Sequence, residues 1–230
     1  MDHLQELFSD IKRGARTEKN PSCFEHLTTE ELESHLQISR YNDFVLSDAI
    51  RPAYNRLVVP TEGYRHDSYE DPETGQAIPV LMISASKEKV FELFQDLLEP
   101  LGTTVDLVLE ASHSNDSTEQ GGLYREHIDM PVLKSILWGF EEQLVNDGCC
   151  GVAVLNPSSQ MEVQFDEHKL LMVYAHDPAP FEEILAQYGI KCNEEIKFLT
   201  EAEHVHSSTE DFAKSFEQIK MEFALDGEYC

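Results

Sequence analysis

The stretch that decides the fold runs from Lys169 to His206 and reads KLLMVYAHDPAPFEEILAQYGIKCNEEIKFLTEAEHVH. It opens with an apolar run over residues 169–175, the pattern of a strand that is covered on both faces. A helix is expected between residues 177 and 189, because an aspartate and a proline can start it and a glycine can end it. Apolar residues then alternate over residues 194–206, which predicts a second strand.

A related stretch lies about ninety positions earlier, over residues 80–113, and it also reads as strand, helix and strand. Three matches carry the likeness, the last of them after one slipped position: Leu81-Met82-Ile83 with Leu171-Met172-Val173, Phe91-Glu92 with Phe181-Glu182, and Glu110-Ala111-Ser112-His113 with Glu201-Ala202-Glu203-His204. The chain therefore looks duplicated.

The fold class that follows is α+β, with two tandem related β-α-β-α halves that form a mixed sheet with helices packed on it, and with an N-terminal helical arm. The boundaries are expected at residues 1–60 for the arm, 61–76 for an acidic loop, 77–148 for the first half, and 149–230 for the second half with an extra β-hairpin. The hairpin strands are expected over residues 151–156 and 161–166, and a long helix over residues 131–146.

The arm is expected to contain three helices and one short strand. Thr28 and Glu31 have the spacing of a capping box, which predicts a helix that runs to about Gln37. The other helices are expected near residues 4–11 and 43–49, and the strand over residues 56–60.

The charge balance restricts the partners. The 230 residues include 44 acidic and 17 basic side chains, which gives a net charge of −27. Such a field repels phosphate backbones and anionic lipid headgroups, so we expect neither nucleic acid nor a membrane surface as a direct ligand. A protein partner or a second copy of the chain is expected instead, and a mimic of nucleic acid that occupies a basic groove is an alternative.

The cysteines and the motifs indicate a cytoplasmic protein without a familiar enzyme signature. The five cysteines are an odd number and have no C-x-x-C spacing, which favours reduced thiols. The first residues lack an export signal, and no apolar stretch is long enough to span a bilayer. No G-x-S-x-G, G-x-x-x-x-G-K-[ST], G-x-G-x-x-G or H-E-x-x-H motif is present.

Histidines at the ends of the two related strands form the candidate metal site. His113, His204 and His206, with Glu203 as a carboxylate, would suit zinc or another divalent ion if the two halves bring them together. The alternative is that each histidine is a polar lid on an apolar strand and hydrogen-bonds a neighbouring loop.

Two other places carry polar groups of interest. The tripeptide Asp166-Glu167-His168 can supply general acid and base groups, or it can be a charged turn between two strands. Candidate partner-binding residues are Tyr64, His66 and Tyr69 in the acidic loop and the single tryptophan, Trp138. Their alternative roles are a solvated linker for the loop and a flank of the core for the tryptophan.

The sequence thus favours a non-catalytic cytosolic binding or regulatory protein that acts through protein association and needs no cofactor. A metal-binding protein or metal-dependent hydrolase that uses the strand-end histidines is the first alternative, and an acidic inhibitor that mimics nucleic acid is the second.

Overall fold

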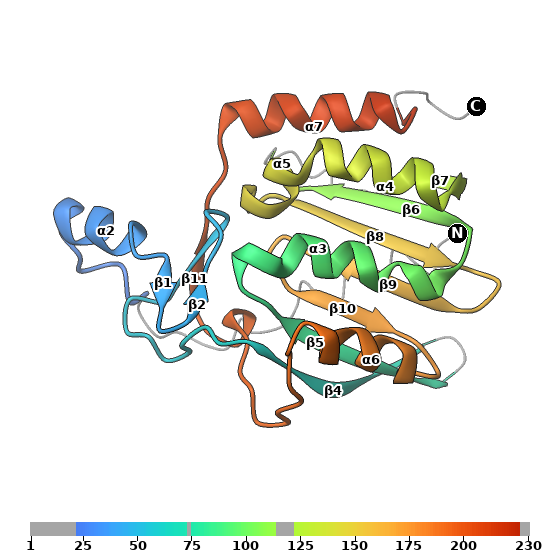
Figure 1. The fold of residues 1–230 in the computed structure, drawn as a ribbon. Coiled ribbons are helices and arrows are strands. Elements are labelled where there is room, and N and C mark those ends of the chain that lie inside the picture. Colours follow the sequence, from blue (N-terminus) through green and yellow to red (C-terminus); the bar gives the residue numbers. More distant parts are fainter. Residues whose placement is uncertain (1–21, 73–74, 114–121, 226–230) are drawn as a thin grey trace.

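A seven-stranded sheet forms the centre of the computed structural model, which describes residues 22–72, 75–113 and 122–225. The strand order is β4-β5-β10-β9-β8-β6-β7 (Figure 1). The strands are β4 (Gly63–Glu70), β5 (Ala77–Ser84), β6 (Thr104–Ala111), β7 (Leu123–Asp129), β8 (Cys150–Asn156), β9 (Met161–Phe165) and β10 (Leu171–Tyr174). The α+β class is confirmed, but every pairing between these strands is antiparallel, so the sheet is not the mixed sheet that we expected.

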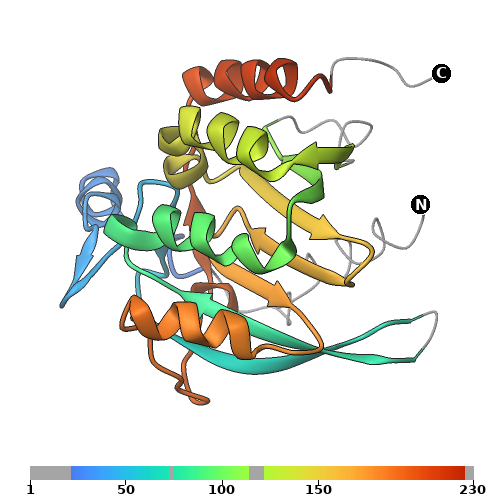
Figure 2. The same ribbon diagram turned by 45° about the vertical axis from the view of Figure 1, so that its right-hand side comes forward.

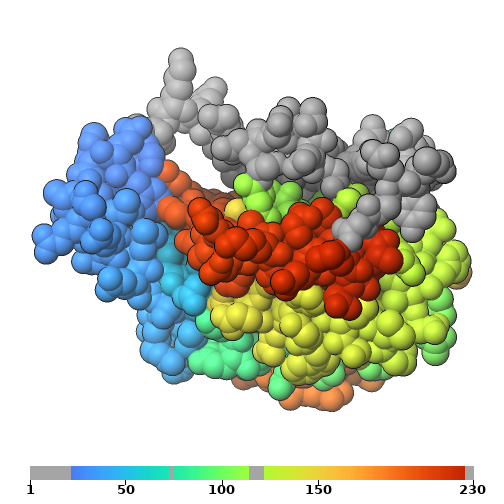
Figure 3. Space-filling view, turned by 90° about the horizontal axis from the view of Figure 1, so that it is seen from above, coloured from blue at the N-terminus to red at the C-terminus, as the bar shows by residue number. Residues whose placement is uncertain are grey.

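Helices cover one face of this sheet, as the two views in Figures 1 and 2 show. They are α3 (Lys87–Leu97), α4 (Met130–Gly139), α5 (Glu141–Asn146) and α6 (Ala179–Gln187). The core between the layers takes alternate residues of the central strands, such as Val163 and Phe165 on β9, and the apolar stripe of α3. In Figure 3 the last helix, α7 (Glu210–Glu222), runs along the surface beside α4 and α5.

A smaller group of elements lies to one side of the sheet (Figure 1) and carries part of the candidate site. It contains α2 (Thr29–Leu36), the hairpin of β1 (Arg40–Tyr41) and β2 (Phe44–Val45), and β3 (Ile50–Pro52), which pairs with β11 (His204–His206). The predicted capping box is confirmed, since the Thr28 hydroxyl accepts from the amide of Glu31 and the Glu31 carboxylate accepts from the amide of Thr28.

The other predictions for the arm fare differently. The prediction of a helix over residues 43–49 is wrong. Asn42 takes a positive φ of 53° in a two-residue turn, and the flanking residues pair as β1 and β2. The strand expected over residues 56–60 does not form, and the segment that pairs is β3, a few residues earlier. The helix expected near residues 4–11 lies outside the described residues.

Both edge strands of the sheet are absent from the sequence prediction. β4 occupies half of the segment 61–76 that we expected to be an acidic loop, and β7 precedes the helix expected from residue 131. An edge strand pairs on one side only and keeps much of its surface in water, so its charged residues hide the strand pattern. The central strands of the extra hairpin, β8 and β9, are confirmed, and the long helix is interrupted at Phe140 into α4 and α5.

The strand expected over residues 194–206 is wrong except for its last three residues. Ile196 and Phe198 alternate as in a strand, but they pack with Leu170 as a separate apolar cluster under a loop. Leu199 then opens the short 3-10 helix η2 (Leu199–Glu201). Only His204–His206 extends, and it joins β3 instead of the large sheet.

Candidate metal centre

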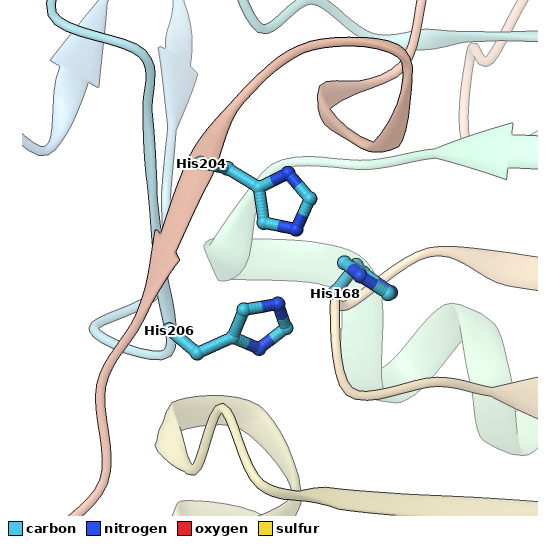
Figure 4. Close-up of side chains that lie close together, drawn as sticks. All are labelled: His168, His204 and His206. Atoms are coloured by element: carbon cyan, nitrogen blue, oxygen red, sulfur yellow. The ribbon is translucent and has the colours of Figure 1, made fainter. Parts of the chain in front are cut away.

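Three histidine side chains converge at the boundary between the sheet and the smaller group of elements (Figure 4). They are His168, His204 and His206, all half-buried, and each offers a nitrogen within 4.8 Å of the nitrogens of the other two. The ring centroids of His168 lie 5.0 Å from those of His204 and 4.7 Å from those of His206, and the last two are 5.0 Å apart. The three rings therefore face a common point.

Two of these side chains come from β11. His204 lies opposite Pro52 of β3, and His206 lies opposite Ile50. Because residues two apart in a strand point to the same side, the pairing directs both imidazoles towards the sheet. The pairing with β3 therefore helps to keep this short strand extended.

The third side chain, His168, comes from the turn between β9 and β10. One carboxylate oxygen of Asp166 accepts hydrogen bonds from the amides of His168, at 3.0 Å, and Leu170, at 2.8 Å. Lys169 takes a positive φ of 61°, which completes the turn. This aspartate therefore fixes the backbone from which the His168 ring extends.

Each ring is also held through its Nδ1 atom. The acceptors are one carboxylate oxygen and two backbone carbonyl oxygens: Asp166 for His168 at 2.8 Å, Ala202 for His204 at 2.8 Å, and Gly148 for His206 at 2.6 Å. A carbonyl oxygen can only accept, so Nδ1 of His204 and of His206 must carry the proton. In the neutral ring Nε2 then has a free lone pair, and these are the atoms left to face one another.

The local charges shift the pKa values of two of these rings in opposite directions. Burial lowers the pKa of His206, and the neighbouring His168 lowers it further, although the bond to Gly148 opposes this. Burial also acts to lower the pKa of His168, but the hydrogen bond and charge of Asp166 outweigh it and raise that pKa. Between these two rings, positive charge is therefore held better at His168, beside its carboxylate, than at His206.

This arrangement could hold a transition-metal ion. Imidazole nitrogen is a ligand for zinc, copper, nickel and iron, and metal-bound histidines usually donate their other ring N–H to a carboxylate or carbonyl oxygen. In the part of the chain that the structure describes, no fourth His, Cys, Asp or Glu joins the three. Three protein ligands would leave a coordination position for water or another ligand, as in catalytic zinc sites.

The structure places the other two predicted ligands elsewhere. His113 donates through Nε2 to the buried carboxylate of Asp147 at 2.7 Å, and its ring packs on Phe216. The Glu203 carboxylate points to the segment before α2, where it accepts from the amide of Cys23 at 2.9 Å and from the hydroxyl of Ser22. Of the four predicted residues, only His204 and His206 are brought together.

His168 lies outside the metal group that the sequence predicts, and residues 166–168 are there a charged turn or an acid–base candidate. The segment is a turn, and its aspartate holds the histidine that completes the group. An Asp-x-His spacing in a turn between two buried strands is a signal that could have drawn attention to it, because the carboxylate can orient the ring.

Three of the predicted partner-binding residues lie on β4, and the fourth, Trp138, lies apart from them on α4. On β4, the buried Tyr64 donates its hydroxyl to Glu182 at 3.1 Å, and Tyr69 packs edge-on against Tyr174. His66 lies in another polar group, which is described further below. Trp138 packs edge-on against Phe91 with 5.0 Å between ring centroids and stays 48% exposed, so it flanks the core and presents one side to solvent.

Comparisons with known proteins add no relative. No protein-family model, curated protein or solved structure matches this chain. Among the described residues, no helix has the length and apolar character that crossing a membrane requires.

Proposed function

We propose that this protein binds a divalent transition metal ion, zinc in the first place, through His168, His204 and His206. The observation that carries the proposal is the set of three Nδ1 hydrogen bonds, which leaves three Nε2 lone pairs directed at a common point. Unprotonated nitrogens do not attract one another, and a cation would satisfy all three at once. Nitrogen ligands favour zinc over magnesium or calcium, which prefer oxygen.

The bound ion would join two parts of the fold. His168 belongs to a turn of the large sheet, whereas His204 and His206 belong to the β3–β11 pair beside it. An ion that binds only the folded arrangement stabilises it by about 2.7 kcal/mol when its free concentration is one hundred times its Kd. Metal removal should therefore loosen the smaller group of elements from the sheet.

The test measures metal content and stability on the same protein. The purified chain, stripped with chelator and reloaded, should bind zinc at this site with a rise in unfolding temperature, and His204→Ala or His206→Ala should abolish both effects. His176→Ala is the matched control, because His176 is exposed in the loop before α6 and outside the group. Equal zinc binding by the wild type and by both site variants would refute the proposal.

Metal-dependent hydrolysis is a second candidate function, favoured by the count of three protein ligands. Zinc with an open position lowers the pKa of its bound water to about 7. Glu167, next to His168, is the carboxylate whose charge acts on both His168 and His206, and it accepts a hydrogen bond from the Ser112 hydroxyl at 3.0 Å. Chromogenic ester and phosphate substrates should be cleaved by the zinc-loaded wild type, and Glu167→Gln should lose that cleavage while it keeps the zinc.

Association with a protein partner, or with a second copy of the chain, is a further proposal. It is supported by the net charge of −27 and by exposed apolar side chains such as Trp138 and Val132 on α4. Light scattering at several concentrations tests self-association. A basic partner, or the basic groove that a nucleic-acid mimic would occupy, should be bound with an affinity that falls steeply as salt rises.

The origin of the body by tandem duplication is also a proposal. Met82 and Met172, which are equivalent in the aligned repeats, lie directly opposite each other in the antiparallel pair of β5 and β10. A local two-fold relation through that pair supports the proposal, because each strand is followed by a helix, α3 or α6, on the same face. The third elements, β6 and β11, have diverged in position.

A further inference from the structure

A second group of metal-binding side chains lies on the surface at the β4 edge of the sheet. The segment after α6 runs beside β4, where Tyr64 and Cys192 form an isolated parallel bridge. The amide of Tyr64 donates to the carbonyl of Lys191 at 3.1 Å, and the amide of Asn193 donates to the carbonyl of Tyr64 at 2.7 Å. These backbone bonds fix the position of the Cys192 thiol relative to the edge strand.

Three different donor types meet there. His66, Cys192 and Glu194 each offer an atom within 4.8 Å of the other two, and all three are exposed. The Glu194 Oε1 atom lies 2.6 Å from Nδ1 of His66 and 3.1 Å from the Cys192 sulfur, which is itself 3.8 Å from Nδ1. One thiol, one imidazole nitrogen and one carboxylate oxygen therefore surround a single point.

The ring of His66 is held through its other nitrogen, Nε2. Its Nε2 atom lies 3.0 Å from Oε1 of Glu182 on α6, and the same oxygen accepts from the Tyr64 hydroxyl at 3.1 Å. A histidine whose Nε2–H donates to this carboxylate has Nδ1 available as a ligand, which is the carboxylate–histidine arrangement that supports bound zinc in other proteins. In the ion-free state the Nδ1 proton is shared with Glu194 instead.

We propose that His66, Cys192 and Glu194 form a second metal site for zinc or a similar thiolate-binding divalent ion, separate from the three-histidine group. Binding would release the Nδ1 proton of His66 and the thiol proton of Cys192 to solvent, and both atoms would then coordinate the ion. Glu182 is a positioning residue, since it holds the ring and does not face the ion. Because its ligands are exposed, this site should bind more weakly than the three-histidine group.

Cobalt(II) distinguishes the two sites, because only a thiolate ligand adds a sulfur-to-cobalt charge-transfer band in the near ultraviolet. Titration of the reduced wild-type chain should give that band, and Cys192→Ser should remove it together with one equivalent of bound metal. Cys23→Ser is the matched control, since Cys23 is a free thiol outside the group, and it should keep the band. Glu182→Gln should keep the band but weaken cobalt binding about 10-fold to 100-fold.

The outcomes separate this proposal from the first. A band that persists in Cys192→Ser, or a wild type without any band, overturns the second site. Loss of metal in His206→Ala with the band intact leaves the second site standing and locates the other ion at the three histidines. A wild-type chain that shows the band but binds only one equivalent of metal refutes the three-histidine proposal and leaves the second site standing.

Discussion

The carbonyl oxygen of Gly148 accepts the Nδ1–H of His206 at 2.6 Å. The same residue is bound on its other side, because its amide donates to the carbonyl of Ser207 at 2.8 Å, and the amide of Ser207 donates to the carbonyl of Ala49 at 2.8 Å. The connection between α5 and β8 thus touches both β11 and the residue before β3. A Cβ atom added at Gly148 would lie 2.2 Å from the Ala49 oxygen, so the close approach requires glycine.

Gly148→Ala is expected to disturb stability and metal binding together. The added methyl group must push the backbone of Ala49 away, at a cost of about 1–3 kcal/mol for an overpacked site. The same shift moves the carbonyl oxygen that orients His206, and loss of the hydrogen bond that orients a metal ligand typically weakens metal binding 10-fold to 100-fold. Urea unfolding of the metal-free chain and a competitive zinc titration measure the two effects separately.

Gly139→Ala is the control for this substitution. Gly139 ends α4, and outside its chain neighbours and the nearby backbone of its own helix no described atom lies within 4 Å of the position that its Cβ would take. Alanine should be neutral or stabilise the helix by up to about 1 kcal/mol, and zinc affinity should not change. If Gly148→Ala changed stability and zinc affinity as little as Gly139→Ala, the backbone of Gly148 would not lie as close to the Ala49 oxygen as the structure places it.

Asp166→Asn tests the orientation of His168 without removing a ligand. Asparagine can keep one oxygen for the amides of His168 and Leu170, but its NH₂ group would face Nδ1 of the ring, which also carries a proton. We expect an unfolding free energy within about 1 kcal/mol of the wild type and zinc affinity reduced about 10-fold to 100-fold. Unchanged zinc affinity in a competition assay would show that this carboxylate does not support the site.

His113→Ala separates a structural histidine from the metal group. Asp147 is fully buried, and besides His113 at 2.7 Å it has the amide of Cys149 at 3.0 Å as a partner. Removal of the imidazole takes one hydrogen-bond partner from this buried carboxylate, so we expect a loss of roughly 3 kcal/mol in urea unfolding. The variant should bind as much zinc per chain as the wild type. Loss of one equivalent of zinc would instead mean that His113 is a metal ligand.

The sequence predicted the fold where local and tertiary preferences agree. Alternation and apolar spacing located β8, β9 and both repeat helices, because those elements bury the residues that their own period places inward, and the capping box located the start of α2. It failed for residues 194–201, where Ile196 and Phe198 have strand spacing but fill an apolar cluster beneath a loop. The pattern records which side chains are buried, and burial does not require a strand.

Prediction of the candidate site was limited because the two related strands, β6 and β11, lie in different sheets. Equivalence of the repeats suggested His113 as the partner of His204, but β6 entered the large sheet while β11 left it, so the equivalent histidines do not meet. His204 and His206 stay together because their spacing of two suffices within one short strand. His168 joins them only through the placement of the β9–β10 turn beside β11, a long-range contact that no local pattern contains.

A buried carboxylate in the middle of the sheet gives the last prediction, which concerns pH. Glu162 of β9 lies opposite Leu155 of β8 and Tyr174 of β10, and its carboxylate accepts from the Gln164 side chain at 2.6 Å. Burial raises the pKa of Glu162 to about 7, although the bond to Gln164 opposes this. An acid whose pKa is raised by folding binds its proton more tightly in the folded state, so the stability it contributes is present below about pH 4.5 and is lost as pH rises to about 7.

Glu162→Gln should therefore stabilise the chain at high pH, because the amide keeps an oxygen for Gln164 and carries no charge to bury. A pKa difference of this size corresponds to at most about 3 kcal/mol at pH 8. In urea unfolding at both pH values, the gain of the variant over the wild type should be roughly 2 kcal/mol larger at pH 8 than at pH 5. Other groups titrate in the same range in both proteins, so their effects cancel in the difference. A gain that is the same at both pH values would mean that Glu162 is ionised in the folded chain throughout, and that burial at this position in β9 does not hold its proton.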